Sequence, residues 1–205
     1  MIITISREYG SGGRDIGKML ADELGLPFYD KEIMHMAAEK SGMSQDFIEK
    51  SGESIPSTFL HNLKYTVYAS SFDSIALYDA PVTDKLFQVQ ASVIKEIASQ
   101  GGCVIVGRCA DYILRGNPDL FTIFIRGELE DRVRYAVEHY NLSNEKATER
   151  VKKIDKHRTN YYKYYTTRQW GSVNNYDLVI NTSFTGISGA VPVIKTMLDV
   201  RESRA

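Results

Sequence analysis

The chain has 205 residues, of which 43% are hydrophobic and 25% are charged. That length can bury a sizeable core and is typical of one domain, and the composition excludes a disordered chain. The 25 Lys and Arg residues nearly cancel the 26 Asp and Glu residues, so the formal net charge is −1. A general polyanion binder is usually basic. We therefore expect no nucleic-acid partner, and we expect any phosphate to be bound by a local cluster of cations.

Signals for export, membrane insertion and thiol or zinc chemistry are missing from the sequence. The first apolar run is too short for a secretory signal, and no segment approaches the ~18 apolar residues of a membrane span. Cys103 and Cys109 make neither a disulfide framework nor a C-x-x-C site, and no two histidines form an H-x-x-x-H pair. We expect a cytoplasmic protein without a membrane partner.

Short apolar runs alternate with amphipathic segments along the first half of the chain. After the first run, apolar residues recur at helical spacing until Gly25, a residue suited to end a helix. The expected elements are a strand at 2–6, a helix at about 16–24, a strand at 26–29, helices at 31–40 and 44–51, one or two helices within 53–80, and a helix at 84–99.

The second half continues the alternation. Fully apolar runs such as 103–106 suit strands that are buried in a parallel sheet. The expected elements are strands at 103–106, 121–125 and 177–181, a helix at 129–140, a helix capped by Ser143 that reaches Tyr165, and a closing helix around 191–198. This order predicts an α/β fold in which a parallel sheet is covered by helices on both faces.

The loop after the first strand reads Gly10, Ser11, Gly12, Gly13, Arg14 and Asp15. Ligands bind at the carboxyl ends of the strands of such a sheet, and glycines let backbone N–H groups approach an anion. The positive end of the next helix and the charge of Arg14 favour phosphate at the same place. The alternative is a glycine-rich turn without a ligand. Met19 after Lys18 departs from the G-x-x-x-x-G-K-[ST] pattern, and Asp15 departs from G-x-G-x-x-G.

Three stretches of the chain resemble the cytidylate kinase-like branch of the nucleoside monophosphate kinases. They are ISREYGSGGRDIG at 5–17, VIVGRCADYIL at 104–114 and DKHR at 155–158. The resemblance implies a three-layer P-loop kinase-like fold with about five parallel strands, forming a single domain over 1–205. Its core would be 1–30, 100–140 and 170–205, its helical acceptor-binding part about 31–99, and its lid about 143–168.

The implied reaction moves the γ-phosphoryl group of ATP, with Mg²⁺, onto a nucleoside monophosphate, typically CMP or dCMP. Catalysis of this transfer is mostly positioning and stabilisation by cations. The resemblance makes Arg14, Arg108 and Arg158 the catalytic cations. Arg108 would hold the acceptor phosphate, and Asp155 would orient Arg158 over the transferring group. The alternative for 152–158 is a solvated basic face. The tyrosines at 161–165 would cover the adenine or pack the lid.

The resemblance also assigns carboxylates and departures from the usual loop. Asp30 would lie near Mg²⁺ and the acceptor phosphate, unless it is simply a helix N-cap. Gly13 stands where ordinary cytidylate kinases carry lysine, and Asp15 stands at the position of their Mg²⁺-binding Ser or Thr. A carboxylate can bind Mg²⁺, so the expected metal ligands are Asp15 and Asp30. Asp111, just beyond the usual Gly-Arg-Asp position, is expected at the acceptor together with Asp30 and Arg108.

These assignments favour an ATP-dependent phosphotransferase that acts on a nucleoside monophosphate. Two alternatives stay open. The missing loop lysine would suit a catalytically weak nucleotide-binding sensor. The replacement of the base-contacting residues after Asp30 by Lys31, Glu32 and Met36 would suit a kinase with a non-nucleotide small-molecule acceptor. The expected partners are ATP and that small molecule, and a homo-oligomer is allowed.

Overall fold

The structure, a computed structural model, describes residues 1–41, 82–140 and 142–204. The helices expected at 44–51 and within 53–80 lie outside these residues, as does part of the expected acceptor-binding segment.

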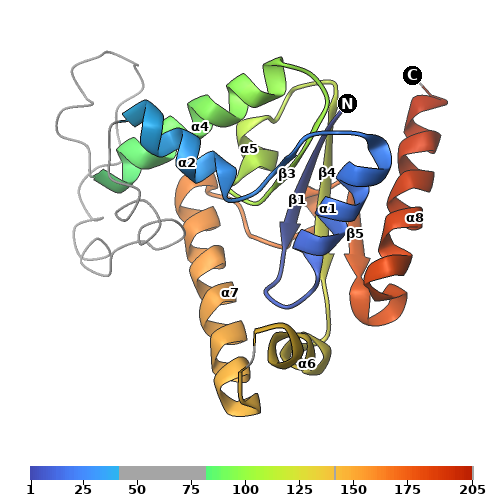
Figure 1. Cartoon of the computed structure of the whole chain (residues 1–205). Helices are drawn as coiled ribbons and strands as arrows, with labels where there is room; N and C mark the ends of the chain where they lie inside the picture. Colours follow the sequence, from blue (N-terminus) through green and yellow to red (C-terminus); the bar gives the residue numbers. More distant parts are fainter. Residues whose placement is uncertain (42–81, 141, 205) are drawn as a thin grey trace.

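The centre of the molecule is a sheet of five parallel strands in the order β2-β3-β1-β4-β5 (Figure 1). The strands are β1 (Ile2–Arg7), β2 (Phe28–Tyr29), β3 (Cys103–Val106), β4 (Leu120–Arg126) and β5 (Leu178–Asn181). All four strand pairs are parallel. Because β1 lies between β3 and β4, the loop that follows β1 emerges beside the ends of both neighbours.

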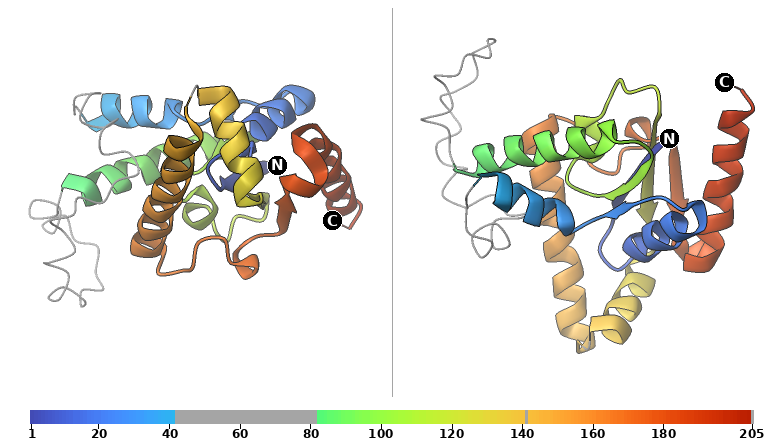
Figure 2. Two further views of the ribbon diagram at one scale, coloured as in Figure 1. Left: turned by 90° about the horizontal axis from the view of Figure 1, so that it is seen from below. Right: turned by 45° about the horizontal axis from the view of Figure 1, so that its top comes forward.

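Helices cover both faces of this sheet, which confirms the three-layer α/β fold. The helices are α1 (Gly13–Leu24), α2 (Glu32–Ser41), α4 (Val82–Ser99), α5 (Ala110–Ile113), α6 (Leu129–Tyr140), α7 (Asn144–Thr166) and α8 (Thr182–Glu202), with a short 3-10 turn, η2 (Val173–Asn175). Figure 2 shows α1 and α8 on one side of the sheet and α2 and α4 on the other. None of the helices in the described ranges is long and apolar enough to cross a membrane.

The alternation of side chains along β1 creates the two cores. Ile3 and Ile5 are fully buried against α1 and α8, whereas Ile2 belongs to the core beneath α2 and α4. Gly12 and Gly25 adopt left-handed backbone angles at the two ends of α1, with φ of 73° and 63°. The expected helix after the glycine loop is therefore confirmed, and it begins three residues earlier than its apolar pattern.

Two elements differ from expectation. The short helix α5 follows three left-handed residues at 107–109, a turn that hydrophobic spacing does not reveal. The closing helix starts at Thr182, well before 191, because its first turn is separated from the rest by a non-helical Gly186. Ser143 is the N-cap residue of α7 as expected, although its hydroxyl makes no capping hydrogen bond.

Helix α7 is 23 residues long and is attached in two places. Near its start, Ala147 and Val151 pack against α6. Near its end, Tyr161 and Tyr162 are buried beside residues of α4 and α5. Both α6 and α7 extend beyond the carboxyl ends of the strands, at the opposite end of the molecule from the two termini (Figure 1).

Candidate active site

The glycine loop between β1 and α1 packs closely against neighbouring elements at each of its glycines. A Cβ atom on Gly10 would lie 2.4 Å from the Arg132 carbonyl oxygen, and one on Gly12 would lie 2.5 Å from the Ile187 side chain. The Ser11 hydroxyl donates a hydrogen bond to the Glu8 carbonyl oxygen at 2.8 Å. Glycine is thus required at these positions for close packing as well as for the positive φ angles of Gly10 and Gly12.

Gly13 begins α1 and has no space for a side chain. A Cβ atom there would lie 2.5 Å from Cβ of Arg7 and 3.3 Å from Cβ of Ile125. Contacts this short require a neighbour to move. The loop therefore cannot accommodate a lysine at this position while Arg7 keeps its present place.

A buried arginine holds the loop from beneath. Arg132 of α6 is 8% exposed, and its Nε donates to the Gly127 carbonyl oxygen at 2.9 Å. Its guanidinium pairs with the carboxylate of Asp155, which also accepts a hydrogen bond of 2.8 Å from the Tyr9 N–H. The Glu8 carboxylate lies 3.4 Å from Arg132. These bonds join the loop to α6 and α7, which sequence patterns alone do not show.

Asp155 is thus placed in this buried network. Its contacts with Tyr9 and Arg132 fix the loop, and its expected role in orienting Arg158 stays a prediction. A carboxylate in the middle of an otherwise basic helical segment is the sequence signal that could have indicated such a buried ion pair.

Asp30, 5% exposed, lies between two arginines at the end of β2. Its Oδ2 accepts a hydrogen bond of 2.7 Å from Nε of Arg14, and its Oδ1 lies 3.9 Å from Nη2 of Arg7. The bond to Asp30 raises the pKa of Arg14, whose side chain is 51% exposed. The Asp30 N–H donates to the carboxylate of Glu32, and this bond lowers the pKa of Glu32. The Asp30 carboxylate therefore holds the guanidinium group of Arg14 and lies near that of Arg7.

Asp15 is the carboxylate that fits Mg²⁺ best. It lies in the first turn of α1, and its Oδ2 accepts a hydrogen bond from the Tyr135 hydroxyl. Burial and this bond raise the pKa of Tyr135. No group of three or more potential metal ligands occurs in the described parts of the chain. Mg²⁺ commonly takes one or two carboxylates and completes its shell with phosphate and water. The oxygen donors of Asp15 suit that habit, whereas Asp30 is already held by two guanidinium groups.

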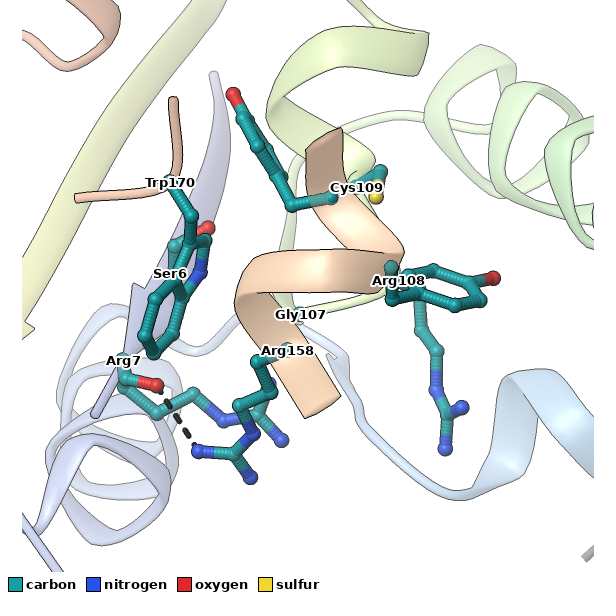
Figure 3. Close-up of a pocket in the computed structure, with 9 residues that line it drawn as sticks. Ser6, Arg7, Gly107, Arg108, Cys109, Arg158 and Trp170 are labelled. Atoms are coloured by element: carbon teal, nitrogen blue, oxygen red, sulfur yellow. Dashed lines mark hydrogen bonds between the residues drawn. The ribbon is translucent and has the colours of Figure 1, made fainter. Parts of the chain in front are cut away.

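A cavity rich in arginine opens where β1 and β3 end, and we call it the arginine cavity (Figure 3). Its lining residues are Ser6, Arg7, Gly107, Arg108, Cys109, Arg158, Tyr161, Tyr162 and Trp170. This lining, which consists of described residues, contains three arginines and no carboxylate. Nη1 of Arg158 donates to the Arg7 carbonyl oxygen at 2.9 Å. Arg108 extends on the other side of Gly107 in Figure 3.

The turn that carries Arg108 is strained. Gly107, Arg108 and Cys109 have φ angles of 78°, 59° and 54°. A non-glycine residue in this left-handed region costs about 1 kcal/mol. Such strain is concentrated at functional sites in proteins. Here it places Arg108 in the lining of the arginine cavity.

Asp111 lies beneath this cavity rather than in its lining. It is 6% exposed, accepts a hydrogen bond of 2.6 Å from the Tyr162 hydroxyl and lies 3.5 Å from the Ser6 hydroxyl. Burial raises the pKa of the Asp111 carboxyl. The residue connects β1, α5 and α7, and its expected contact with the acceptor stays a prediction.

The tyrosines at the end of α7 pack against neighbouring helices. Tyr161 and Tyr162 are buried, and the ring of Tyr165 stacks on Phe87 at 3.9 Å. The hydroxyl of Tyr165 also lies 3.2 Å from the carboxylate of Asp84. Between the two interpretations of these residues, the geometry favours packing over an adenine cover.

A second cavity, which we call the open cavity, lies on the other side of the glycine loop and has a volume of about 310 Å³. Its lining residues are Gly10, Ser11, Asp131, Arg132, Arg134, Tyr135, Glu138, Thr182, Ser183, Gly186 and Ile187. Acidic and basic side chains are both present, and residues near the start of α8 complete the lining. The two cavities therefore differ in the charge of their lining residues.

Comparisons with known proteins find relatives over nearly the whole chain. The profile of the cytidylate kinase-like family matches residues 2–184. A cytidylate kinase from Methanocaldococcus jannaschii is 25% identical over 202 residues, which is 97% of this chain and 98% of that protein. A cytidylate kinase from Pyrococcus horikoshii is 26% identical and covers 97% of this chain and 88% of its own length.

Solved structures give the same fold. An uncharacterized protein from Eubacterium ventriosum superimposes with a TM-score of 0.73 at 25% identity, covering 97% of this chain and 98% of that one. A shikimate kinase from Bacteroides thetaiotaomicron has a TM-score of 0.53 at 13% identity, with coverage of 97% and 98%. The second similarity concerns the fold alone.

Proposed function

The chain belongs to the cytidylate kinase-like family, and from this premise we propose that it is an ATP-dependent kinase that converts a nucleoside monophosphate such as CMP or dCMP to the diphosphate. The observation that carries the proposal is the arginine cavity. Arg7, Arg108 and Arg158 come from β1, the turn after β3 and α7, and they line one cavity beside a glycine loop. Converging cations without lining carboxylates suit the negative charge of a phosphate group.

The donor would be bound by the glycine loop. Backbone N–H groups at Gly12 and Gly13 and the positive end of α1 favour the phosphates of ATP. The open cavity adjoins the loop at Gly10 and Ser11 and has room for the nucleoside part. Asp15 would hold Mg²⁺, which supplies neutralisation of phosphate charge when it is bound.

The acceptor would be bound by the arginine cavity. Arg108 holds the acceptor phosphate, and Arg158 faces the transferring group from α7. Arg14, held by Asp30 at 2.7 Å, meets the phosphates from its half-exposed position. An acceptor phosphate oxygen forms a bond to the γ-phosphorus as the bond between that phosphorus and the bridging oxygen breaks. ADP leaves with the electron pair, and the arginines stabilise the spread negative charge.

A coupled ADP-release assay tests this function. Mg-ATP is mixed with CMP, dCMP, UMP, AMP or GMP in turn, and a reaction without acceptor measures background ATP hydrolysis. We expect turnover with a cytidine nucleotide to exceed that with the other bases by about tenfold or more. ATP binding without turnover on any nucleotide would contradict the proposal and favour a nucleotide sensor or a kinase with a non-nucleotide acceptor.

A further inference from the structure

The last residue of β1, Arg7, occupies the space that a loop lysine would need. We infer that the Arg7 guanidinium contacts the transferring phosphates and takes over the function of that lysine. This inference rests on the proposed function and names a further catalytic residue for it.

The Arg7 side chain fills the space that a side chain at position 13 would need. By its resemblance to ordinary cytidylate kinases, Gly13 stands at the lysine position. A Cβ atom on Gly13 would lie 2.5 Å from Cβ and 3.0 Å from Cγ of Arg7. Both side chains would start from the same space beneath the first turn of α1. An arginine at position 7 therefore excludes a lysine at position 13, so only one of these two positions can carry a cation.

The side chain of Arg7 runs from β1 toward the ends of the neighbouring strands. Arg7 follows Ile3 and Ile5 in the alternation of β1 and so faces α1. From there it runs to Gly107, where a Cβ atom would lie 2.1 Å from Nη1 of Arg7. Its Nη2 lies 3.9 Å from Asp30. The absence of a side chain at Gly107 thus makes room for the guanidinium where β1, β2 and β3 end.

The guanidinium group of Arg7 adds to the positive charge of the arginine cavity. Arg7 shares the arginine cavity with Arg108 and Arg158, and the side chain of Arg7 is only 14% exposed. Asp30 lies beside this group, with its carboxylate 2.7 Å from Arg14 and 3.9 Å from Arg7. Several guanidinium groups in one mostly buried place attract an anion more strongly than an exposed arginine does. A phosphoryl group in the cavity would interact with all three arginines.

The test compares Arg7→Gln and Arg7→Lys with Arg14→Gln. Lys18→Gln is the matched control, because Lys18 is an exposed cation on α1, the helix that carries Arg14. Turnover is measured by ADP release, and binding of inorganic tripolyphosphate is measured by calorimetry without acceptor. We expect Arg7→Gln to lower kcat by about 100-fold or more and to weaken tripolyphosphate binding by about tenfold or more. Arg7→Lys should keep at least about a tenth of kcat, and Arg14→Gln, which removes a half-exposed phosphate contact, should lower kcat by a smaller factor than Arg7→Gln does. Lys18→Gln should stay within about twofold of wild type.

The exchange variant Arg7→Gly/Gly13→Lys keeps the inference falsifiable if Arg7→Gln folds poorly. Steric exclusion predicts that Gly13→Lys alone destabilises the protein. It also predicts that the exchange variant regains kcat at least tenfold over Arg7→Gly. No gain over Arg7→Gly would overturn the inference, as would tripolyphosphate affinity and kcat within threefold of wild type in Arg7→Gln.

A purely structural role for Arg7 has a different signature. It would lower the Tm of the free protein and leave the rise in Tm caused by tripolyphosphate unchanged, and this result would overturn the inference. If the wild type phosphorylates no nucleotide, the proposed function fails, and the tripolyphosphate measurement still decides the contribution of Arg7. Weaker binding by Arg7→Gln then supports that contribution, and no binding by the wild type overturns both proposals.

Discussion

The two cavities beside the glycine loop differ in the kind of wall they have. The arginine cavity is lined by three arginines and no carboxylate among the described residues. The lining of the open cavity contains the acidic residues Asp131 and Glu138 as well as Arg132 and Arg134. Positive charge is thus concentrated in the arginine cavity, where phosphoryl groups would meet in the proposed function. In the open cavity, the proposed site of the neutral nucleoside, acidic and basic residues balance each other. Charge variants should therefore have unequal effects on the two sides.

Arg158→Ala is expected to have the largest effect. In the proposed function Arg158 faces the transferring group, so its removal should lower kcat by about 10³-fold through loss of charge stabilisation in the transition state. Arg158→Lys should recover part of the loss. Steady-state ADP release measures both, with Lys152→Ala, an exposed position on α7, as the control. A kcat within threefold of wild type in Arg158→Ala would show that Arg158 belongs to the solvated basic face.

Asp155→Ala tests the network that lies between the cavities. Arg132 would lose its closest carboxylate while staying buried, although Glu8 remains 3.4 Å away. Breaking such a pair should lower the free energy of unfolding by about 2–3 kcal/mol. Urea denaturation measures this change. Asp131→Ala breaks the exposed pair with Arg134 and should cost less than about 0.5 kcal/mol. Equal losses in the two variants would contradict the buried role of Asp155.

Asp111→Asn tests the floor of the arginine cavity through pH. Burial raises the pKa of the Asp111 carboxyl, so the folded protein holds this proton more tightly than the unfolded chain does. The contribution of Asp111 to stability is then full below the ordinary carboxyl pKa near 4 and falls as pH rises through the folded pKa. Asparagine cannot ionise and can still accept the Tyr162 hydrogen bond. The stability of Asp111→Asn relative to wild type should grow as pH rises above about 4 in urea denaturation. A constant or shrinking difference would contradict this sign.

Arg134→Gln should have the smallest effect. Its side chain is 66% exposed and pairs with Asp131 on the balanced side of the loop. We expect the KM for ATP and kcat to stay within about twofold of wild type, since exposed pairs contribute little. A tenfold rise in the KM for ATP would remove the contrast between the two cavities.

Sequence patterns predict the scaffold well because it depends on local rules. Short apolar runs locate the five strands, and helical spacing of apolar residues locates α1, α6 and α7, within a few residues. The left-handed angles at 107–109 and the kink at Gly186 depend on tertiary packing, and no apolar periodicity encodes them.

The candidate site is predictable only in part, for a physical reason. The glycine loop and Arg108 are recognisable because they follow strands directly. Asp155 pairs with Arg132 of α6, 23 residues earlier in the chain. In the sequence alone, four nearer cations are equally plausible partners: Lys152, Lys153, Lys156 and Arg158. The steric exclusion between the Arg7 side chain and any side chain at position 13 depends on tertiary packing, so no local sequence pattern shows it.

The double attachment of α7 couples that helix to α6. Tyr161 and Tyr162 fix one end, whereas Ala147 and Val151 pack against α6 near the other. Between these contacts, Asp155 pairs with Arg132 of α6, and Arg158 lies one turn, ~4.5 Å along the axis, from Tyr161. A displacement of α7 must therefore carry α6 with it or break a buried ion pair, so the two helices together hold Arg158 in register with the glycine loop.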